Sequence, residues 1–423
     1  MRAAALIIII FTCFRLSAQD ADFASLYEQG RYEDALRIVN GELDSFYSTR
    51  LEDKRIPSDF ISMKSDKEDI NLNLIFRYRK AKGFFIEDNP KLANLHVSAA
   101  ACHAALGRRR EAISNYTQAL RFKNVELGKD DAIYYALSQI YKKAGQFEGY
   151  IAALESAFTL NPERYAYSLE LGISLAPTTR KTKALYHLER YMNNTDDDID
   201  PSLYLTAGNL NEDLGYYLNT QDYYQKYLSV KTNDGVIHFA LGYIAFAKTG
   251  SHRLAASSFA RALELLPEAD IYHRSKAHEY TADMALSDLQ FQKAIDHYGE
   301  TIKYQEQVLE RIKSGDAKIR EISERINLRK AEVLKDQNYE SFKEYESLEE
   351  EKGKLALELN KQRRQYEMLN CGTVRWNTAW AYERIEEYQS AIEFYRQSIS
   401  FDYRSNDSRE KIIKLQLKIK RGY

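Results

Sequence analysis

Few residues in this chain have the types and spacing that metal binding or catalysis requires. His278 and Glu279 begin like a zinc-binding helix, but the second histidine of that motif does not follow. His273 and His278 are five residues apart, a spacing that does not place both side chains on one helix face. "DDDID" at 196–200 lacks the glycine and the distal glutamate of a calcium loop. We therefore expect no metal, no cofactor and no catalytic site.

Other motifs of enzymes and nucleic-acid binders are also missing from the sequence. It contains no phosphate-binding loop, no glycine-rich dinucleotide turn and no serine nucleophile motif. Its 60 basic and 62 acidic residues give a net charge of −2, whereas nucleic-acid binding needs a clustered positive field. "RRR" at 108–110 lies at a predicted turn, where solvated side chains are the simpler interpretation than an anion site. These observations favour a non-catalytic protein that binds other proteins and no nucleic acid.

The chain is instead rich in residues that pack helices against one another. Residues 132–144 have the apolar spacing of a helix. Gly145 follows, and glycine ends helices because it takes positive φ at no steric cost. A second apolar stretch then runs to Pro162, which cannot continue a helix. This segment predicts a helix, a tight turn and a second helix.

The same pattern recurs along the chain. Counted from each turn, a small residue follows at position +5 and an apolar residue at position +9 in most units. The predicted turn positions are Gly30, Gly107, Gly145, Thr179, Gly215, Gly250, Leu289 and Glu386, of which Thr179 fits least well. From 107 to 289 consecutive turns are 34 to 39 residues apart. A period near 34 residues of helix–turn–helix units resembles the tetratricopeptide repeat family.

This resemblance implies an all-α fold, a right-handed superhelical solenoid in which each unit buries the apolar face of its neighbour. In that family the first helix of each pair lines a concave groove that binds peptides or partner helices. Carried over to this chain, the groove residues are Tyr135, Gln139, Lys142, Lys143, Asn209, Glu212, Asp213, Trp376 and Trp380. For the two tryptophans, packing under the helix after Asp407 or against the hairpin described next remains the alternative interpretation.

Residues 304–370 interrupt the repeat and change the apolar period to seven. Branched residues recur at this spacing at Ile312, Ile319, Ile326 and Val333, and a second set of heptads follows the break at "KDQNYE". Two arms of about 30 residues, each about 45 Å long if helical, predict an antiparallel coiled-coil hairpin that stands off the solenoid. We expect Gly315, Lys352 and Gln362 to weaken its seam, and the hairpin to be dispensable for folding of the array but not for function.

The first twenty residues have the features of a targeting signal. An apolar run from Ala3 to Phe14 ends in small residues, which predicts a signal peptide over residues 1–19. We expect export to a bacterial periplasm, with an N-terminal membrane anchor, an extracellular location or lipidation of Cys13 as alternatives. No later segment has 18 consecutive apolar residues, so no membrane span is expected after cleavage.

The predicted organisation is a signal peptide at 1–19, a repeat array at 20–303 with a degenerate unit near 51–90, the coiled-coil hairpin at 304–370, a terminal repeat at 371–404 and a capping helix or tail at 405–423. In the degenerate unit, Phe84 to Ile86 predict either a docking patch or packing under the next unit. Cys102 and Cys371 lie in distant units, so we expect two unpaired thiols.

The sequence as a whole predicts a scaffold for other proteins of an envelope assembly, such as a secretion or motility machine. The envelope context rests on fold and compartment alone. Oligomerisation through the coiled coil is compatible with this function. A sensory or regulatory protein that combines repeats with a coiled coil is the alternative.

Overall fold

The computed structural model describes residues 18–52, 90–121, 131–195, 198–336 and 339–422, and every regular element in these ranges is a helix. The predicted all-α repeat fold is confirmed. The predicted signal peptide lies almost wholly outside the described residues, as do most of the degenerate unit and the segment from Phe84 to Ile86. The chain divides into two compact units, 1–199 and 200–423, which are considered separately.

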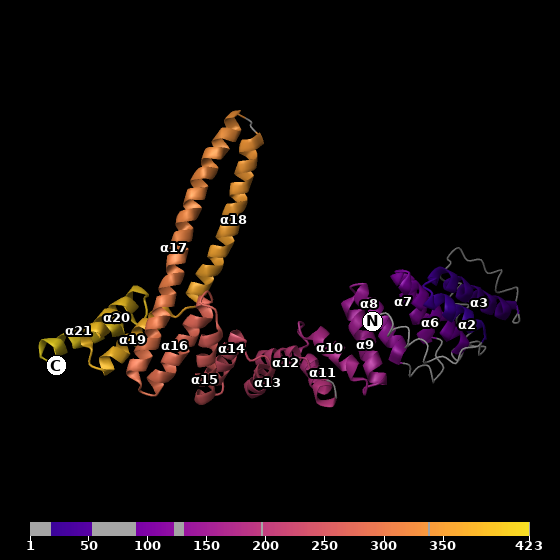
Figure 1. Ribbon diagram of the computed structural model, residues 1–423, viewed down its shortest axis with the longest axis horizontal. Helices are drawn as coiled ribbons and strands as arrows, with labels where there is room; N and C mark the ends of the chain where they lie inside the picture. The colour runs from indigo at the N-terminus through magenta and orange to yellow at the C-terminus, as the bar shows by residue number, and fades with distance from the viewer. Residues whose placement is uncertain (1–17, 53–89, 122–130, 196–197, 337–338, 423) are drawn as a thin grey trace, which may run out of the picture. The chain divides into compact units, whose positions relative to one another are not determined.

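The first unit consists of helices in antiparallel pairs (Figure 1). Its described helices are α2 (Ala18–Glu28), α3 (Tyr32–Glu52), α6 (Pro90–Ala105), α7 (Arg109–Arg121), α8 (Asp131–Lys143), α9 (Phe147–Leu160), α10 (Tyr165–Leu175) and α11 (Lys181–Asn194). The pairs are α2 with α3, α6 with α7, α8 with α9 and α10 with α11. Each pair packs on the next, through α3 and α6, α7 and α8, and α9 and α10.

The second unit continues this arrangement and adds a projecting hairpin (Figure 1). Its helices are α12 (Pro201–Asp213), α13 (Tyr217–Val230), α14 (Gly235–Ala247), α15 (His252–Leu265), α16 (Ile271–Ser287), α17 (Phe291–Asp336), α18 (Tyr339–Glu367), α19 (Cys371–Arg384), α20 (Tyr388–Ser400) and α21 (Ser405–Lys420). Because α17 also packs against α19, the array continues past the hairpin. Helix α21 packs against α20.

The predicted turns have the backbone that their sequence pattern requires. Seven of the eight positions are left-handed, with φ of 73° at Gly30, 75° at Gly107, 71° at Gly145, 79° at Gly215, 68° at Gly250, 59° at Leu289 and 67° at Glu386. Thr179 is the exception, and it also fits the sequence pattern least well. Glycine accounts for five of these turns because the missing Cβ removes the steric cost of this conformation.

The core follows the same count from each turn. The residues at position +5 are at most 2% exposed: Ala35, Ala112, Tyr150, Ala184, Thr220, Ala255, Ala294 and Ala391. The residues at position +9 are equally buried: Val39, Tyr116, Leu154, Leu188, Tyr224, Phe259, Tyr298 and Tyr395. Except at Tyr150, the residue at position +5 is small and lets the two helices approach, and the residue at position +9 fills the remaining space, which close packing of the interior requires.

The hairpin consists of the long helix α17 and the returning helix α18. Helix α17 has 46 residues and runs without a break through residue 304, the boundary predicted from the sequence. Its first turns are thus the second helix of a repeat and its later turns the first arm of the hairpin. Near the distal end, Ile322 and Ile326 of α17 pack on Leu348 of α18, and all three are buried. Residues 337–338, between the arms, are not described.

Candidate interaction surfaces

Two predicted groove residues of α8 are engaged by the neighbouring repeat. The side-chain amide of Gln139 donates to the Oε1 atom of Glu170 on α10 at 3.0 Å, and Lys142 Nζ donates to the same atom at 2.7 Å. The buried Tyr150 hydroxyl donates to it as well, at 3.0 Å. Burial raises the pKa of the Glu170 carboxyl, but the hydrogen bonds from Gln139 and Lys142 hold it below the usual value. These residues therefore join consecutive repeats.

The other two predicted residues of α8 differ in exposure. The half-buried ring of Tyr135 lies 5.1 Å from the ring of Tyr167 on α10, centroid to centroid. The guanidinium of Arg164 lies 6.0 Å from the centre of the Tyr135 ring and 5.0 Å from that of Tyr167. Burial and the nearby carboxylate of Glu170 raise the pKa of Tyr135. Lys142 and Lys143 are both exposed, but Glu170 pairs with Lys142, so Lys143 is the one of these four residues most open to a partner.

Two of the predicted groove residues of α12 are hydrogen-bond acceptors for a buried hydroxyl. The Tyr224 hydroxyl lies 2.8 Å from Asn209 Oδ1 and 2.7 Å from Glu212 Oε2, so its single proton has two acceptors within reach. In another repeat Tyr395 donates to Glu383 Oε2 at 2.8 Å. A buried hydroxyl without an acceptor costs about 1–3 kcal/mol, so these side chains have a packing role that the sequence pattern does not reveal. The third predicted residue, Asp213, is exposed.

The two tryptophans pack in different places. Trp376 is half-buried among Tyr395 of α20 and Ile412 and Leu415 of α21. The guanidinium of Arg404 lies 4.1 Å above its ring. Trp380 packs edge-on against Phe291 at the start of α17, with ring centroids 5.7 Å apart. The helix after Asp407 therefore covers Trp376, whereas Trp380 contacts the repeat portion of α17.

A cluster of aromatic residues on α14 and α16 has no counterpart among the predicted site residues. Phe239 and Tyr243 of α14 and Tyr280 of α16 are half-buried, with the ring of Tyr280 6.3 Å from that of Phe239 and 5.5 Å from that of Tyr243. Lys248 lies 5.8 Å above the Tyr243 ring. Tyr272, at the start of α16, is also half-buried. The signal in the sequence is the four-residue spacing of Phe239 and Tyr243, which matches the spacing of Trp376 and Trp380.

A cleft of about 220 Å³ lies between the start of α16 and the two arms of the hairpin. Its apolar lining includes Ile271, Val308 and Leu369. Arg311 of α17 and Lys361 of α18 supply cations, and Asp270 and Glu358 supply carboxylates. Tyr272 also lines the cleft, which therefore adjoins the aromatic residues of α16.

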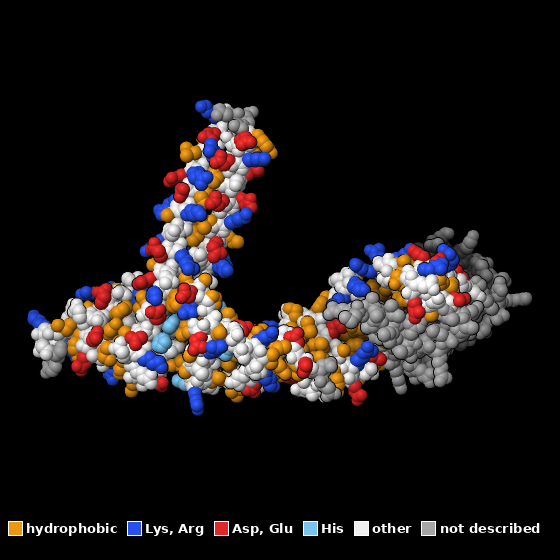
Figure 2. Space-filling view, in the orientation of Figure 1, with side chains coloured by type: hydrophobic (Ala, Val, Ile, Leu, Met, Phe, Trp, Pro, Cys, Tyr) orange, Lys and Arg blue, Asp and Glu red, His pale blue; other side chains and the backbone are white. Residues whose placement is uncertain are grey.

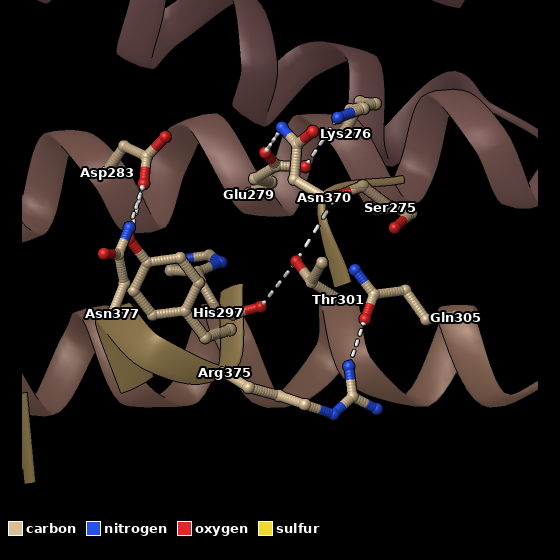
Figure 3. Close-up of polar contacts among 11 residues, drawn as sticks. Ser275, Lys276, Glu279, Asp283, His297, Thr301, Gln305, Asn370, Arg375 and Asn377 are labelled. Carbon is tan, nitrogen blue, oxygen red and sulfur yellow. Dashed lines mark hydrogen bonds and ion pairs between the residues drawn. The ribbon is translucent and has the colours of Figure 1, made fainter. Parts of the chain in front are cut away.

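Buried polar contacts fix the chain where the hairpin returns to the array (Figure 3). Lys276 Nζ and Glu279 Oε2 of α16 are 2.9 Å apart, with side chains 6% and 5% exposed. Asn370, directly before α19, donates to Glu279 Oε1 at 2.6 Å. A buried charge must be paired and hydrogen-bonded to be tolerated, and Glu279 meets both conditions. The pair thus ties the end of the insertion to α16.

Two further contacts join α19 to the neighbouring helices (Figure 3). Arg375, which is 5% exposed, donates to Gln305 Oε1 of α17 at 2.7 Å. Asn377 donates to the Tyr298 hydroxyl of α17 at 3.1 Å, and that hydroxyl donates to the Asp283 carboxylate of α16. Burial raises the pKa of Asp283 despite these hydrogen bonds. Helices α16, α17 and α19 therefore form one polar junction at the base of the hairpin.

The described residues contain no cluster of three histidine, cysteine or acidic side chains that could hold a metal ion. Cys102 and Cys371 are buried and unpaired, and burial raises the pKa of Cys102 to about 12 and also raises that of Cys371. Such thiols are poor nucleophiles and poor metal ligands, because the thiolate is the reactive form. Among the described helices, none combines the length and the apolar character that crossing a membrane requires.

Two helix pairs match a known repeat family. The sequence profile described as "Tetratricopeptide repeat" matches residues 132–164, which span α8 and α9, and residues 373–404, which span α19 and α20. The chain is a tetratricopeptide repeat protein. The left-handed turns at Gly145 and Glu386 lie at the centres of these two tetratricopeptide repeats. No curated protein matches the sequence.

Several solved structures are similar to this tetratricopeptide repeat protein. A crystal structure of MamA is 16% identical, covers 43% of this chain and 96% of its own, and has a TM-score of 0.34. YrrB, described as a TPR protein with an unusual peptide-binding site, is 18% identical, with coverage of 45% and 92% and a TM-score of 0.35. The C-terminal part of a TPR repeat-containing protein from Cytophaga hutchinsonii is 15% identical, with coverage of 67% and 94% and a TM-score of 0.35.

Proposed function

We propose that this tetratricopeptide repeat protein is a non-catalytic scaffold that binds other proteins through the first helices of its repeats and through its hairpin. The observation that carries the proposal is the set of half-buried aromatic side chains on α14 and α16, of which Tyr272 lines the cleft under the hairpin. Partly exposed tyrosine and phenylalanine rings offer large contact areas with few rotatable bonds, which is why aromatic residues are enriched at protein interfaces.

The hairpin supports the same function. Its distal half makes no contribution to the array core, because the core clusters that join α17 to the repeats end near Ile312. Charged side chains of both signs cover its surface, with hydrophobic side chains between them (Figure 2). Leu328 and Leu357 are 67% and 76% exposed. A projecting element with exposed apolar residues that the array does not bury is suited to contact a partner.

The compartment of this function is also a proposal. The apolar run from Ala3 to Phe14 and the small residues after it support export, with partners in the bacterial envelope, for example in a secretion or motility assembly. N-terminal sequencing of protein from its native host should give a mature end near residues 19–21. A chain that begins at Met1 would contradict cleavage, and fractionation would then show whether the protein is anchored.

Site-specific photo-crosslinking in the native host tests the binding surface. A photoreactive phenylalanine at Tyr243 or at Leu357 should trap partner proteins. The same residue at Ala256, an exposed position on the second helix α15, is the matched control and should trap far less. Equal yields at all three positions would contradict the proposal, because partners would then show no preference for the first helices or the hairpin.

A further inference from the structure

Two exposed apolar surfaces of the second unit carry opposite charge. The first, called the tail surface, consists of Ile413 and Leu417 on α21, which are 59% and 48% exposed. Residues 413–421 include four cations, at Lys414, Lys418, Lys420 and Arg421, and no acid. The second, called the tip surface, consists of Tyr339 and Phe342 at the start of α18, and residues 339–351 include six glutamates and one lysine.

Packing of α21 on the array does not bury the tail surface. Helix α21 packs on α20 through a side that includes the buried residues Ser408 and Leu415. Ile413 and Leu417 are four residues apart and share the opposite, exposed side. An amphipathic helix normally has polar residues on that side. Lys420 and Arg421 are also exposed and form no ion pair within the described part of the chain.

Packing between the two arms of the hairpin does not bury the tip surface either. Leu348 is the residue that α18 buries against α17 at this level, whereas Tyr339 and Phe342 remain 68% and 41% exposed. Glu346 and Glu349 are exposed and have no ion-pair partner among the described residues. On α18 the tip surface therefore combines exposed aromatic rings with a net negative charge, six glutamates against one lysine, opposite in sign to the tail surface.

We propose that the tail surface of one copy of this chain docks on the tip surface of a second copy. Within one copy the two surfaces cannot meet. The 29 residues of α18 extend about 44 Å away from the array, while α21 lies along α20 (Figure 1). Opposite charge steers the encounter, and burial of the isoleucine, leucine and aromatic side chains stabilises the contact.

The contact joins two different surfaces, so each copy in a pair keeps one free tail surface and one free tip surface. Such heterologous association leads to closed rings or to open chains. This inference goes beyond the proposed scaffold function, which requires no self-association. The two proposals can fail separately. Oligomers that bind no partner would support self-association alone, and a monomer that binds partners would support the scaffold function alone.

Paired charge reversals test the contact by sedimentation velocity over a range of protein concentrations. The full chain should associate at about 0.1 M salt and dissociate at about 1 M salt, where the Debye length falls from about 10 Å to about 3 Å. The double variants Lys420→Glu/Arg421→Glu and Glu346→Lys/Glu349→Lys should each weaken association at least about tenfold. An equimolar mixture of the two variants should recover it, because the reversed tip surface complements the reversed tail surface.

Several results would overturn the proposal. These are a full chain that stays monomeric up to about 100 µM at low salt, a variant that associates as well as the parent, or a mixture that recovers nothing. Vesicles of anionic and of zwitterionic phospholipid provide the remaining comparison. If the monomeric full chain binds the anionic vesicles and the tail variant does not, the tail surface binds membranes instead. Circular dichroism spectra of both variants should match that of the parent, which makes loss of association attributable to charge.

Discussion

Leu359 of α18 occupies the space that a side chain at Gly315 of α17 would need. A Cβ atom at Gly315 would lie 2.3 Å from Leu359 Cδ2 and 2.9 Å from its Cγ. Leu359 is 2% exposed, so it has little freedom to move aside. Gly315 was predicted to weaken the seam of the hairpin, and this prediction is wrong. The missing side chain is what allows the two arms to pack closely at this level.

Gly315→Ala should therefore destabilise the hairpin. Alanine gains about 1 kcal/mol over glycine in a helix interior, but overpacking a filled site costs about 1–3 kcal/mol, so we expect a net loss of about 1 kcal/mol. Gly353 of α18 provides a matched control, because nothing lies within 4 Å of its added Cβ. Gly353→Ala should stabilise the hairpin by about 0.5–1 kcal/mol. Amide hydrogen exchange in α17 and α18 measures both effects, and equal protection in the two variants would contradict the close contact.

Glycine at either of the two non-glycine turns that precede α17 and α20 should stabilise the protein. Leu289 has φ of 59° and Glu386 has φ of 67°, a backbone that costs a residue with a side chain about 1–2 kcal/mol. Leu289 is 65% exposed, so Leu289→Gly loses little packing and should stabilise by about 0.5–1 kcal/mol. Gly145→Ala is the converse change and should destabilise. Thermal unfolding midpoints of the two variants should shift in opposite directions, and a shift in the same direction would refute the argument.

The repeat could be predicted from the sequence because its determinants are local and recur. A left-handed turn favours glycine at one position, and helix pairing favours a small residue at position +5 and a large one at position +9. Each requirement appears again about 34 residues later, so one poor unit such as that of Thr179 does not hide the pattern. The helical hairpin was equally visible, because its apolar period changes to seven.

The roles of the predicted groove residues could not be read from the sequence. Gln139 is a polar residue on a first helix, and whether it faces a partner or Glu170 depends on a residue 31 positions away. Glu212 likewise looks like a solvated acid until the Tyr224 hydroxyl is placed beside it. The lack of a helix break at residue 304 escaped prediction for a related reason, since no residue there favours or opposes a boundary.

A histidine pair between α16 and α17 should make stability depend on pH. The Nδ1 atoms of His278 and His297 are 2.9 Å apart, so one ring donates and the other accepts a hydrogen bond when both are neutral. Burial, with a smaller contribution from His297, lowers the pKa of His278 from 6.5 to about 4. Burial, with a smaller contribution from Lys293, also lowers the pKa of His297. The unfolded chain then binds protons that the folded chain does not. The stabilisation is complete above about pH 6.5 and is lost as pH falls towards about 4.

The double variant His278→Gln/His297→Gln measures this contribution. With allowance for the partial exposure of both rings, the pair should account for about 1 kcal/mol of the stability lost between pH 7 and pH 4.5. Denaturant unfolding of the parent and the variant at several pH values gives the difference, which should shrink as the pH falls. A constant difference across this range would show that the two rings titrate normally in the folded protein.

The base of the hairpin belongs to the array core, whereas its distal part does not. Tyr304, Val308 and Ile312 of α17 and Leu369 pack on Ile271 at the start of α16. A deletion of residues 319–355, closed by a short turn, removes none of these side chains and should leave the thermal unfolding midpoint of the array unchanged. A deletion of residues 305–370 removes three of them and exposes Ile271.

Each buried side chain of this kind contributes about 1.5–3 kcal/mol, so the longer deletion should lower the unfolding midpoint of the second unit markedly. Thermal unfolding followed by circular dichroism compares the two deletions, with the first unit of the chain as the internal reference. Equal stability of both deletions would show that the base is not part of the core. Repeat stability is a sum of contacts between neighbouring repeats, and the distal arms take part in none of them. Unfolding of the shorter deletion variant would therefore show that the distal hairpin is needed for folding.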